Sequence, residues 1–261
     1  MTARTILILL LLSSTGIRAE EKKDEKKKEP QVVLAVPPAV IAGTKTAVTI
    51  RGLNLDKITE IKFTESTVKA EIKAKGKADI PKPLDAPQAG DTKVDIDLEV
   101  PAGAPPGPLT FTLAAAEGTT KAHSLIVFAP GTLVAESEPN NAYRTAPEFP
   151  LGKTVLGTIQ DSNDVDVYRI EAKAGQLIVA RVAAQAVKSN VDATLTLIDA
   201  RGTPLSVSDD TESGRDPALR QALPADGIYY LVLQDAHARG GPTHNYLLTA
   251  QLEAATSSVK P

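Results

Sequence analysis

The sequence predicts an all-β protein built of two tandem β-sandwiches. Apolar and charged residues alternate with a period of two in several short runs, which is typical of half-buried antiparallel strands. Segments rich in Gly and Pro separate these runs, and no stretch shows convincing helical periodicity. The chain has 261 residues, 42% of them hydrophobic, which suits two domains of modest size.

The chain begins with what we expect to be a targeting segment. Arg4 is basic, residues 6–12 are apolar, and small residues lead to a cleavage point after Ala19. The apolar stretch is far shorter than the roughly 20 residues of a membrane-spanning helix. We therefore expect residues 1–19 to be a signal peptide, and the mature protein to be secreted or periplasmic with no transmembrane segment.

Charge and composition divide the rest of the chain. Residues 20–30 hold five acids, five lysines and no apolar side chain, so we expect a solvated charged linker. Residues 31–130 have eleven acids and eleven bases, whereas residues 131–261 have sixteen acids and eleven bases. We predict one domain at 31–130, a second at 131–253, and a disordered tail at 254–261.

Strands are expected throughout the first half. The clearest alternation places Val94, Ile96, Leu98 and Val100 between charged residues. Shorter apolar stretches predict further strands at 48–50, 61–63, 68–72 and 109–113. Together these runs predict a small sandwich of about seven strands.

The order of these pieces in the first half resembles an immunoglobulin-like domain of the IPT/TIG type. The residues that carry the likeness are at 36–38, 42–44, 48–55 and 58–63. The Lys- and Pro-rich insertion from Lys73 to Gln88 departs from the family pattern. The resemblance implies a spacer or interaction module and supplies no catalytic residue.

The second half also has short apolar runs, bounded by Gly, Pro and Asp turns. These runs predict strands at 177–182, 193–198, 228–233 and 246–252. We expect four tyrosines to pack in the core with their hydroxyl groups at its rim: Tyr168, Tyr229, Tyr230 and Tyr246.

Several separated motifs of this half agree in order with one family. They lie at 136–141, 157–159, 161–170 and 223–232. This string resembles the bacterial pre-peptidase C-terminal domain, and the likeness extends over residues 135–252. The resemblance implies a jelly-roll-like sandwich of the kind found beside secreted proteases and related to clostridial collagen-binding modules.

Two loops rich in oxygen-bearing side chains are candidates for a metal site. The first holds Glu136, Glu138, Asn140 and Asn141, and the second holds Asp161, Asn163, Asp164 and Asp166. Calcium takes six to eight oxygen ligands, and like charges that meet in one place repel unless a cation lies between them.

The family resemblance implies that these two loops form a single site. Calcium-binding relatives use the acidic opening segment together with the acid-rich loop that follows. This favours Glu136, Glu138, Asn140, Asn141 and Asp166 as ligands, with the other three side chains of the second loop as additional candidates. Solvated turns without metal are the alternative. An EF-hand is excluded, because an acid stands where its loop requires Gly.

Catalysis finds little support in the sequence. No nucleophile-elbow, zinc-protease or phosphate-loop motif occurs, and the chain has no Cys. We expect His123, His237 and His244 to be surface residues. The protein is therefore predicted not to be an enzyme; an unrecognised hydrolase that depends on His237 or His244 is the least favoured alternative.

The binding partner is narrowed by composition. The acidic second half opposes binding to nucleic acid, and the absence of Trp disfavours an aromatic platform for sugars. We expect a bacterial binding or accessory protein whose partner is a protein or an envelope or extracellular matrix polymer. The alternative is a targeting or folding accessory of a separately encoded secreted protease.

Overall fold

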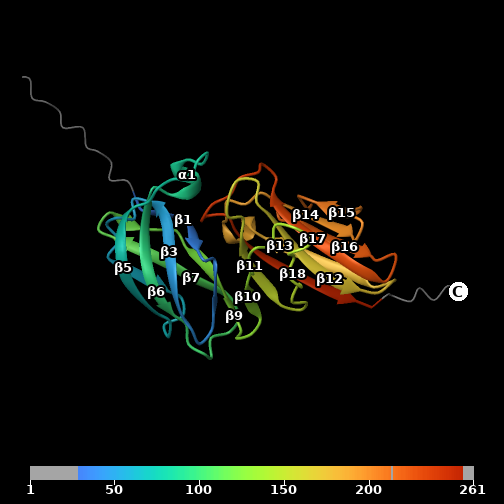
Figure 1. Cartoon of the computed structure of the whole chain (residues 1–261). Helices are drawn as coiled ribbons and strands as arrows, with labels where there is room; N and C mark the ends of the chain where they lie inside the picture. The colour runs from blue at the N-terminus through green and yellow to red at the C-terminus, as the bar shows by residue number, and fades with distance from the viewer. Residues whose placement is uncertain (1–28, 213, 255–261) are drawn as a thin grey trace, which may run out of the picture.

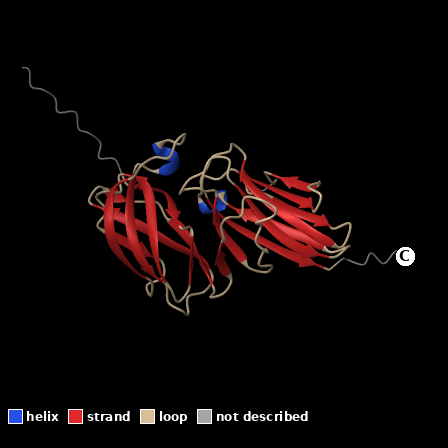
Figure 2. Ribbon diagram, viewed as in Figure 1, coloured by secondary structure: helices blue, strands red, loops and turns tan. Residues whose placement is uncertain are grey.

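The computed structural model describes residues 29–212 and 214–254. The predicted signal peptide lies outside these residues, as do nearly all of the charged linker and the tail. Strands dominate the described chain, and they fall into two groups of sheets that follow one another along the sequence (Figure 1, Figure 2). The predicted fold class, all-β with two tandem sandwiches, is confirmed.

The first sandwich consists of strands β1 to β9. One sheet has the order β1 (Gln31–Val36), β3 (Lys45–Leu53), β6 (Thr92–Glu99) and β5 (Lys69–Lys77). The other has the order β2 (Ala39–Ile41), β9 (His123–Phe128), β7 (Gly107–Ala115) and β4 (Glu60–Phe63), with β8 (Gly118–Thr119) paired to β7. The one-turn helix α1 (Ala86–Ala89) precedes β6.

The period of two in β6 decides which side chains enter the first core. Val94, Ile96 and Leu98 are buried, while Asp95 and Asp97 point outward. The prediction of about seven strands is wrong, because the described part of this sandwich has nine. The strands β2 and β8 have three and two residues, too few to show any alternation.

The second sandwich consists of strands β10 to β18. One sheet has the order β10 (Leu133–Ala135), β11 (Thr154–Thr158), β18 (Asn245–Glu253), β13 (Leu177–Ala183) and β16 (Ala218–Ala222). The other has the order β12 (Val165–Ala172), β17 (Gly227–Asp235), β14 (Ala193–Asp199) and β15 (Pro204–Ser208). A short 3-10 helix, η1 (Gln185–Val187), follows β13.

The core of the second sandwich includes tyrosine hydroxyl groups. Tyr168 of β12 and Tyr246 of β18 are almost fully buried, and their hydroxyl oxygens are 2.6 Å apart. The expectation that these hydroxyls lie at the rim of the core is wrong for this pair. Facing strands of the two sheets each place one tyrosine inward, so the hydroxyls meet between the sheets.

The two sandwiches contact each other through a small apolar cluster. Ala39 of β2 packs with Leu133, Val187 and Leu247 of the second sandwich. The strand pairing changes from one sandwich to the other between Phe128 and Leu133. Among the described residues, no helix is long and apolar enough to cross a membrane.

Candidate metal centre

The opening segment of the second sandwich brings acidic residues from both sheets together. Glu136 directly follows β10, and its backbone N–H donates to the carbonyl of Leu156 in β11. The chain then crosses to the other sheet, where the carbonyl of Asn140 accepts the N–H of Val167 in β12. Since Asp166 precedes Val167, the crossing places it beside the glutamates of the opening segment.

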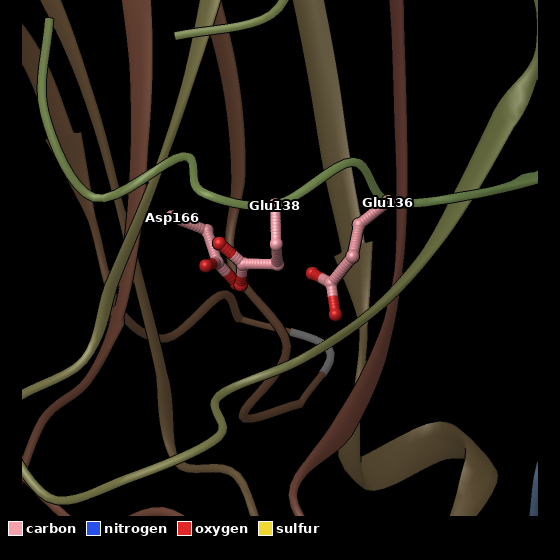
Figure 3. Close-up of side chains that lie close together, drawn as sticks. All are labelled: Glu136, Glu138 and Asp166. Carbon is pink, nitrogen blue, oxygen red and sulfur yellow. The ribbon is translucent and has the colours of Figure 1, made fainter. Parts of the chain in front are cut away.

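The carboxylates of Glu136, Glu138 and Asp166 converge. One carboxylate oxygen from each lies within 4.8 Å of the others, and Figure 3 shows the three groups turned toward one another. Glu138 is exposed, Glu136 is half-buried and Asp166 is fully buried. The site therefore has one open side, through which an ion could enter.

Part of each glutamate is held by the surrounding backbone or side chains. Oε1 of Glu136 accepts the N–H of Thr158 at 2.8 Å. Oε2 of Glu138 accepts the N–H of Asn140 at 2.8 Å, and its Oε1 accepts Nε2 of Gln160 at 3.1 Å. These bonds orient the two side chains before any ion is present.

Two buried side chains keep oxygen atoms without a hydrogen-bond partner among the described residues. They are Oδ1 of Asp166 and Oδ1 of Asn140, and the amide nitrogen of Asn140 is likewise unpaired. Both residues are fully buried. Buried polar atoms are nearly always paired, so Oδ1 of Asp166 is available to bind a cation. The side-chain amide of Asn140 acts on the Asp166 carboxylate and lowers its pKa.

The carboxylates are electrostatically costly to one another. Burial, together with the nearby Asp166 carboxylate, raises the pKa of Glu136 to about 8. Burial also raises the pKa of Asp166 to about 7, and the charges of Asp164 and Glu138 act in the same direction. At neutral pH the ion-free site therefore retains protons, which a divalent cation would displace.

Tyr246 connects the carboxylates to the core. Its hydroxyl lies 2.6 Å from Oδ2 of Asp166 and 3.2 Å from Oε2 of Glu136, and it also contacts the hydroxyl of Tyr168. A tyrosine hydroxyl has a single proton to donate. Because Tyr246 donates its proton to a carboxylate, it accepts the hydrogen bond from Tyr168. Burial raises the pKa of both tyrosines, which keeps them neutral donors.

Gly157 makes room for this arrangement. It pairs with Tyr246 across β11 and β18, and a Cβ atom at this position would lie 2.2 Å from Cζ of the tyrosine ring. The same Cβ would lie 2.5 Å from Oε2 of Glu136. Gly157 and Tyr246 cannot be recognised as site residues from the sequence, because their pairing depends on strand register.

The remaining predicted ligands lie around an adjacent hollow. Asn141 donates to Oδ1 of Asp164, whose Oδ2 accepts the N–H of Gln160 at 2.6 Å. Asp161 and Asn163 are exposed and line a hollow of about 510 Å³ together with Asn141, Asp164 and Glu138. These four side chains shape the loop beside the three converging carboxylates and do not join them.

The donor set fits a hard divalent cation. The three carboxylates supply oxygen donors, which calcium prefers, and water can complete a shell of six to eight. The described residues of the site supply neither sulfur nor imidazole, which zinc favours. Bound there, a cation would neutralise the charges that now repel one another.

The three histidines differ in exposure, and only His237 is exposed as predicted. His244 is 1% exposed and both ring nitrogens lack a partner among the described residues, so the prediction of a surface histidine is wrong for this position. His123 is partly buried, and burial with the charge of Lys188 lowers its pKa to about 4. His237 is exposed and lies 3.2 Å from the Asp192 carboxylate.

Comparisons with known proteins support the assignment of the second sandwich. Residues 164–235 match the family described as the bacterial pre-peptidase C-terminal domain, which confirms the predicted resemblance for this region. A probable subtilase-type serine protease of Deinococcus radiodurans is 39% identical over 97 residues. The aligned part is 36% of this chain and only 13% of that relative.

Two solved structures are similar to part of the chain at low identity. The pre-peptidase C-terminal domain of a Bacillus anthracis collagenase is 17% identical, with a TM-score of 0.35; the match covers 43% of this chain and all of that domain. A periplasmic inhibitor of g-type lysozyme from Aeromonas hydrophila is also 17% identical, with a TM-score of 0.31, over 47% of this chain and 96% of the inhibitor.

Proposed function

We propose that the second sandwich binds a calcium ion and that the protein is a non-catalytic binding or accessory protein of the bacterial envelope or extracellular space. Glu136, Glu138 and Asp166 would supply charged ligands, and Asn140 a neutral one. The observation that carries the proposal is the convergence of three carboxylates beside buried oxygens that lack partners.

Calcium would stabilise the attachment of the opening segment to the second sandwich. The opening segment is joined to β12 by few bonds, and an ion shared by Glu138 and Asp166 would fasten it there. Extracellular modules bind calcium with dissociation constants of about 10⁻⁴ to 10⁻³ M, which suits an exported protein in calcium-containing surroundings. An ion that fastens the opening segment to β12 would also protect this segment from proteolysis.

Thermal unfolding with calcium and with a chelator tests the proposal. Calcium at about 100 times its dissociation constant should stabilise the second sandwich by about 2.7 kcal/mol. The double variant Glu136→Gln/Asp166→Asn should lose this response, whereas Glu171→Gln, an exposed position on the same strand as Asp166, should keep it. Melting and protease resistance that are unchanged by chelator would refute calcium binding.

The second candidate function is that of an accessory to a separately encoded secreted protease, in targeting or folding. The identity with part of a subtilase-type serine protease favours it. Co-purification with a secreted protease, and higher yield of active protease when the two are expressed together, would support this role. Binding of the isolated protein to insoluble matrix or envelope polymer would instead favour adhesion.

A further inference from the structure

The Lys- and Pro-rich insertion of the first sandwich forms an arm that reaches the second sandwich. We define the docking arm as residues 78–91, which include α1. Arg51 of β3 holds this arm, since its guanidinium donates to the carbonyls of Ala89 at 2.7 Å, of Gly90 at 3.1 Å, and of Asp79. Asp85 and Gln88 close a capping box around α1. The arm is therefore an ordered part of the first sandwich.

The arm contacts the second sandwich at Asn190 and near residues 236–244, which we define as the seam loop. Nδ2 of Asn190 donates to the carbonyl of Gln88 at 2.9 Å, and the backbone N–H of Asn190 donates to the carbonyl of Thr243 at 3.1 Å. A Cβ atom on Gly241 would lie 3.9 Å from Cβ of Pro81. Asn190 thus links the arm directly to the seam loop.

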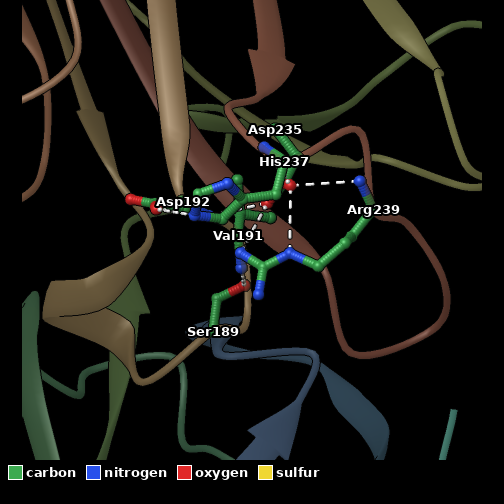
Figure 4. Close-up of polar contacts among 6 residues, drawn as sticks. All are labelled: Ser189, Val191, Asp192, Asp235, His237 and Arg239. Carbon is green, nitrogen blue, oxygen red and sulfur yellow. Dashed lines mark hydrogen bonds and ion pairs between the residues drawn. The ribbon is translucent and has the colours of Figure 1, made fainter. Parts of the chain in front are cut away.

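The base of the seam loop is fixed by a buried carboxylate. Oδ1 of Asp235 accepts the N–H groups of His237 and Arg239 at 2.9 and 3.0 Å, as well as Nε of Arg239 at 3.1 Å (Figure 4). Its Oδ2 accepts the N–H of Asp192 at 2.9 Å. These bonds anchor this end of the loop, which lines a cavity of about 240 Å³ together with Leu84 and Gln88 of the arm.

The other side of the seam loop contacts the loop beside the candidate metal centre. The N–H of Asn163 donates to the carbonyl of Ala238 at 3.1 Å, and both residues have positive φ, of 67° and 55°. A Cβ atom on Gly240 would lie only 2.1 Å from the carbonyl oxygen of Asp161. The backbones of the two loops are in close contact, and Asn163 and Ala238 both have left-handed backbone conformations. We therefore expect the two loops to move together.

A short route of bonds then leads to a candidate ligand. The N–H of Ile159 donates to the carbonyl of His244 at 3.0 Å, which joins the seam loop to the residue before Gln160. The side chain of Gln160 donates to Oε1 of Glu138. A cation bound between Glu138 and Asp166 would fix the Glu138 carboxylate, and with it the side chain of Gln160 and the backbone on which the seam loop rests.

We propose that cation binding at the acidic centre and docking of the arm are energetically coupled through the seam loop. The proposal rests on the calcium site proposed above and adds a regulatory role: calcium sets how firmly the two sandwiches are held together. Coupling of this kind is reciprocal, because an ion that strengthens docking must itself bind more tightly to the docked form.

Distances between labels on the two sandwiches test the proposal. The chain contains no cysteine, so Glu65→Cys and Lys173→Cys, both at exposed positions, provide two spin-label sites in an otherwise unchanged full chain. Pulsed electron paramagnetic resonance measures the distribution of distances between the two labels. Calcium should make this distribution narrower. The same pair combined with Glu136→Gln/Asp166→Asn should show no narrowing.

The reciprocal test measures calcium affinity by calorimetry. Asn190→Ala removes the bond to Gln88 without touching a candidate ligand, and should weaken calcium binding by about threefold or more. Gln251→Ala, an exposed amide on β18, should leave the affinity unchanged.

The outcomes separate the coupling from the calcium site itself. Calcium binding with an unchanged distance distribution, or an Asn190→Ala protein with full affinity, would overturn the coupling and leave the calcium site standing. Failure of the unaltered chain to bind calcium would overturn both proposals.

Discussion

The two sandwiches share an architecture but differ in what they bury. In the described part of the first, Thr120 is the one polar side chain that is buried. The residues described in the second include eight buried polar or charged ones: Asn140, Thr154, Asp164, Asp166, Asp235, Thr243, His244 and Asn245. The first sandwich keeps its charges on the surface, in pairs such as Lys45 with Asp97 at 3.0 Å.

This difference suggests that the first sandwich is a scaffold and that the second holds the functional site. Exposed ion pairs contribute little to stability, so the first sandwich depends on its apolar core. The second carries like charges and unpaired oxygens at one end, an arrangement that costs stability unless a ligand compensates for it. Equivalent substitutions in the two sandwiches should therefore have unequal, and sometimes opposite, effects.

The largest effects should come from the cores, where the two sandwiches are alike. Leu98→Ala in the first and Leu231→Ala in the second remove fully buried side chains, and each should lower the free energy of unfolding by about 2–5 kcal/mol. Denaturant unfolding measures both. A folded Leu98→Ala protein should retain its calcium affinity. Loss of calcium binding in that protein would contradict the assignment of the calcium site to the second sandwich.

Glycine substitutions should distinguish the two sandwiches next. Gly157→Ala forces Cβ against the ring of Tyr246 and the carboxylate of Glu136, so it should cost about 1–3 kcal/mol and weaken calcium binding. Gly76→Ala in β5 is the matched control, since its Cβ would meet no atom within 4 Å. Its effect on stability should be within about 0.5 kcal/mol. Equal effects would show that the space above Gly157 is not needed.

Removing a carboxylate should have opposite signs in the two sandwiches. Without calcium at pH 8, Asp166→Asn removes a repelled buried charge and should stabilise the second sandwich by about 1 kcal/mol. Partial burial alone would raise the pKa of Asp95, but hydrogen bonds from Lys93 and Thr49 lower it. Asp95→Asn should therefore destabilise the first sandwich slightly. Chemical unfolding checks both, and a destabilised Asp166→Asn protein would contradict the account.

A pH dependence of stability should be confined to the second sandwich. The folded-state pKa values of Glu136 and Asp166, about 8 and about 7, lie above their ordinary values. Their contribution to stability is therefore complete below about pH 4 and is lost as pH rises through 7 and 8. In ion-free protein, the free energy of unfolding of the second sandwich should therefore fall as the pH rises from 6 to 9. A flat profile would contradict these pKa values.

Calcium affinity should change in the opposite direction over the same range. Protons compete with the ion for Glu136 and Asp166, so binding should tighten as pH rises from 6 to 9. Titrations at several pH values measure this trend. Affinity that is independent of pH would indicate that the ion binds elsewhere.

Much of the fold could be predicted because strand alternation is local. The run from Val94 to Val100 shows which of its side chains are buried, and β6 bears this out. The strands β2 and β8 could not be predicted, since they exist through pairing with β9 and β7 and not through their own pattern.

The candidate site could be predicted only in part. The acidic residues stand out in the sequence, but which of them converge depends on how the opening segment crosses from one sheet to the other. Gly157 and Tyr246 are 89 positions apart along the chain, and only the register of β11 with β18 joins them. The burial of His244 and the docking of the arm likewise depend on contacts between distant segments.

Calorimetric titration of the full chain with calcium at pH 8, in two buffers of different ionisation enthalpy, tests the central claim most directly. The account predicts one ion per chain, release of protons on binding, and no heat from the Glu136→Gln/Asp166→Asn protein. Absence of binding by the unaltered chain, or undiminished binding by the double variant, would contradict it.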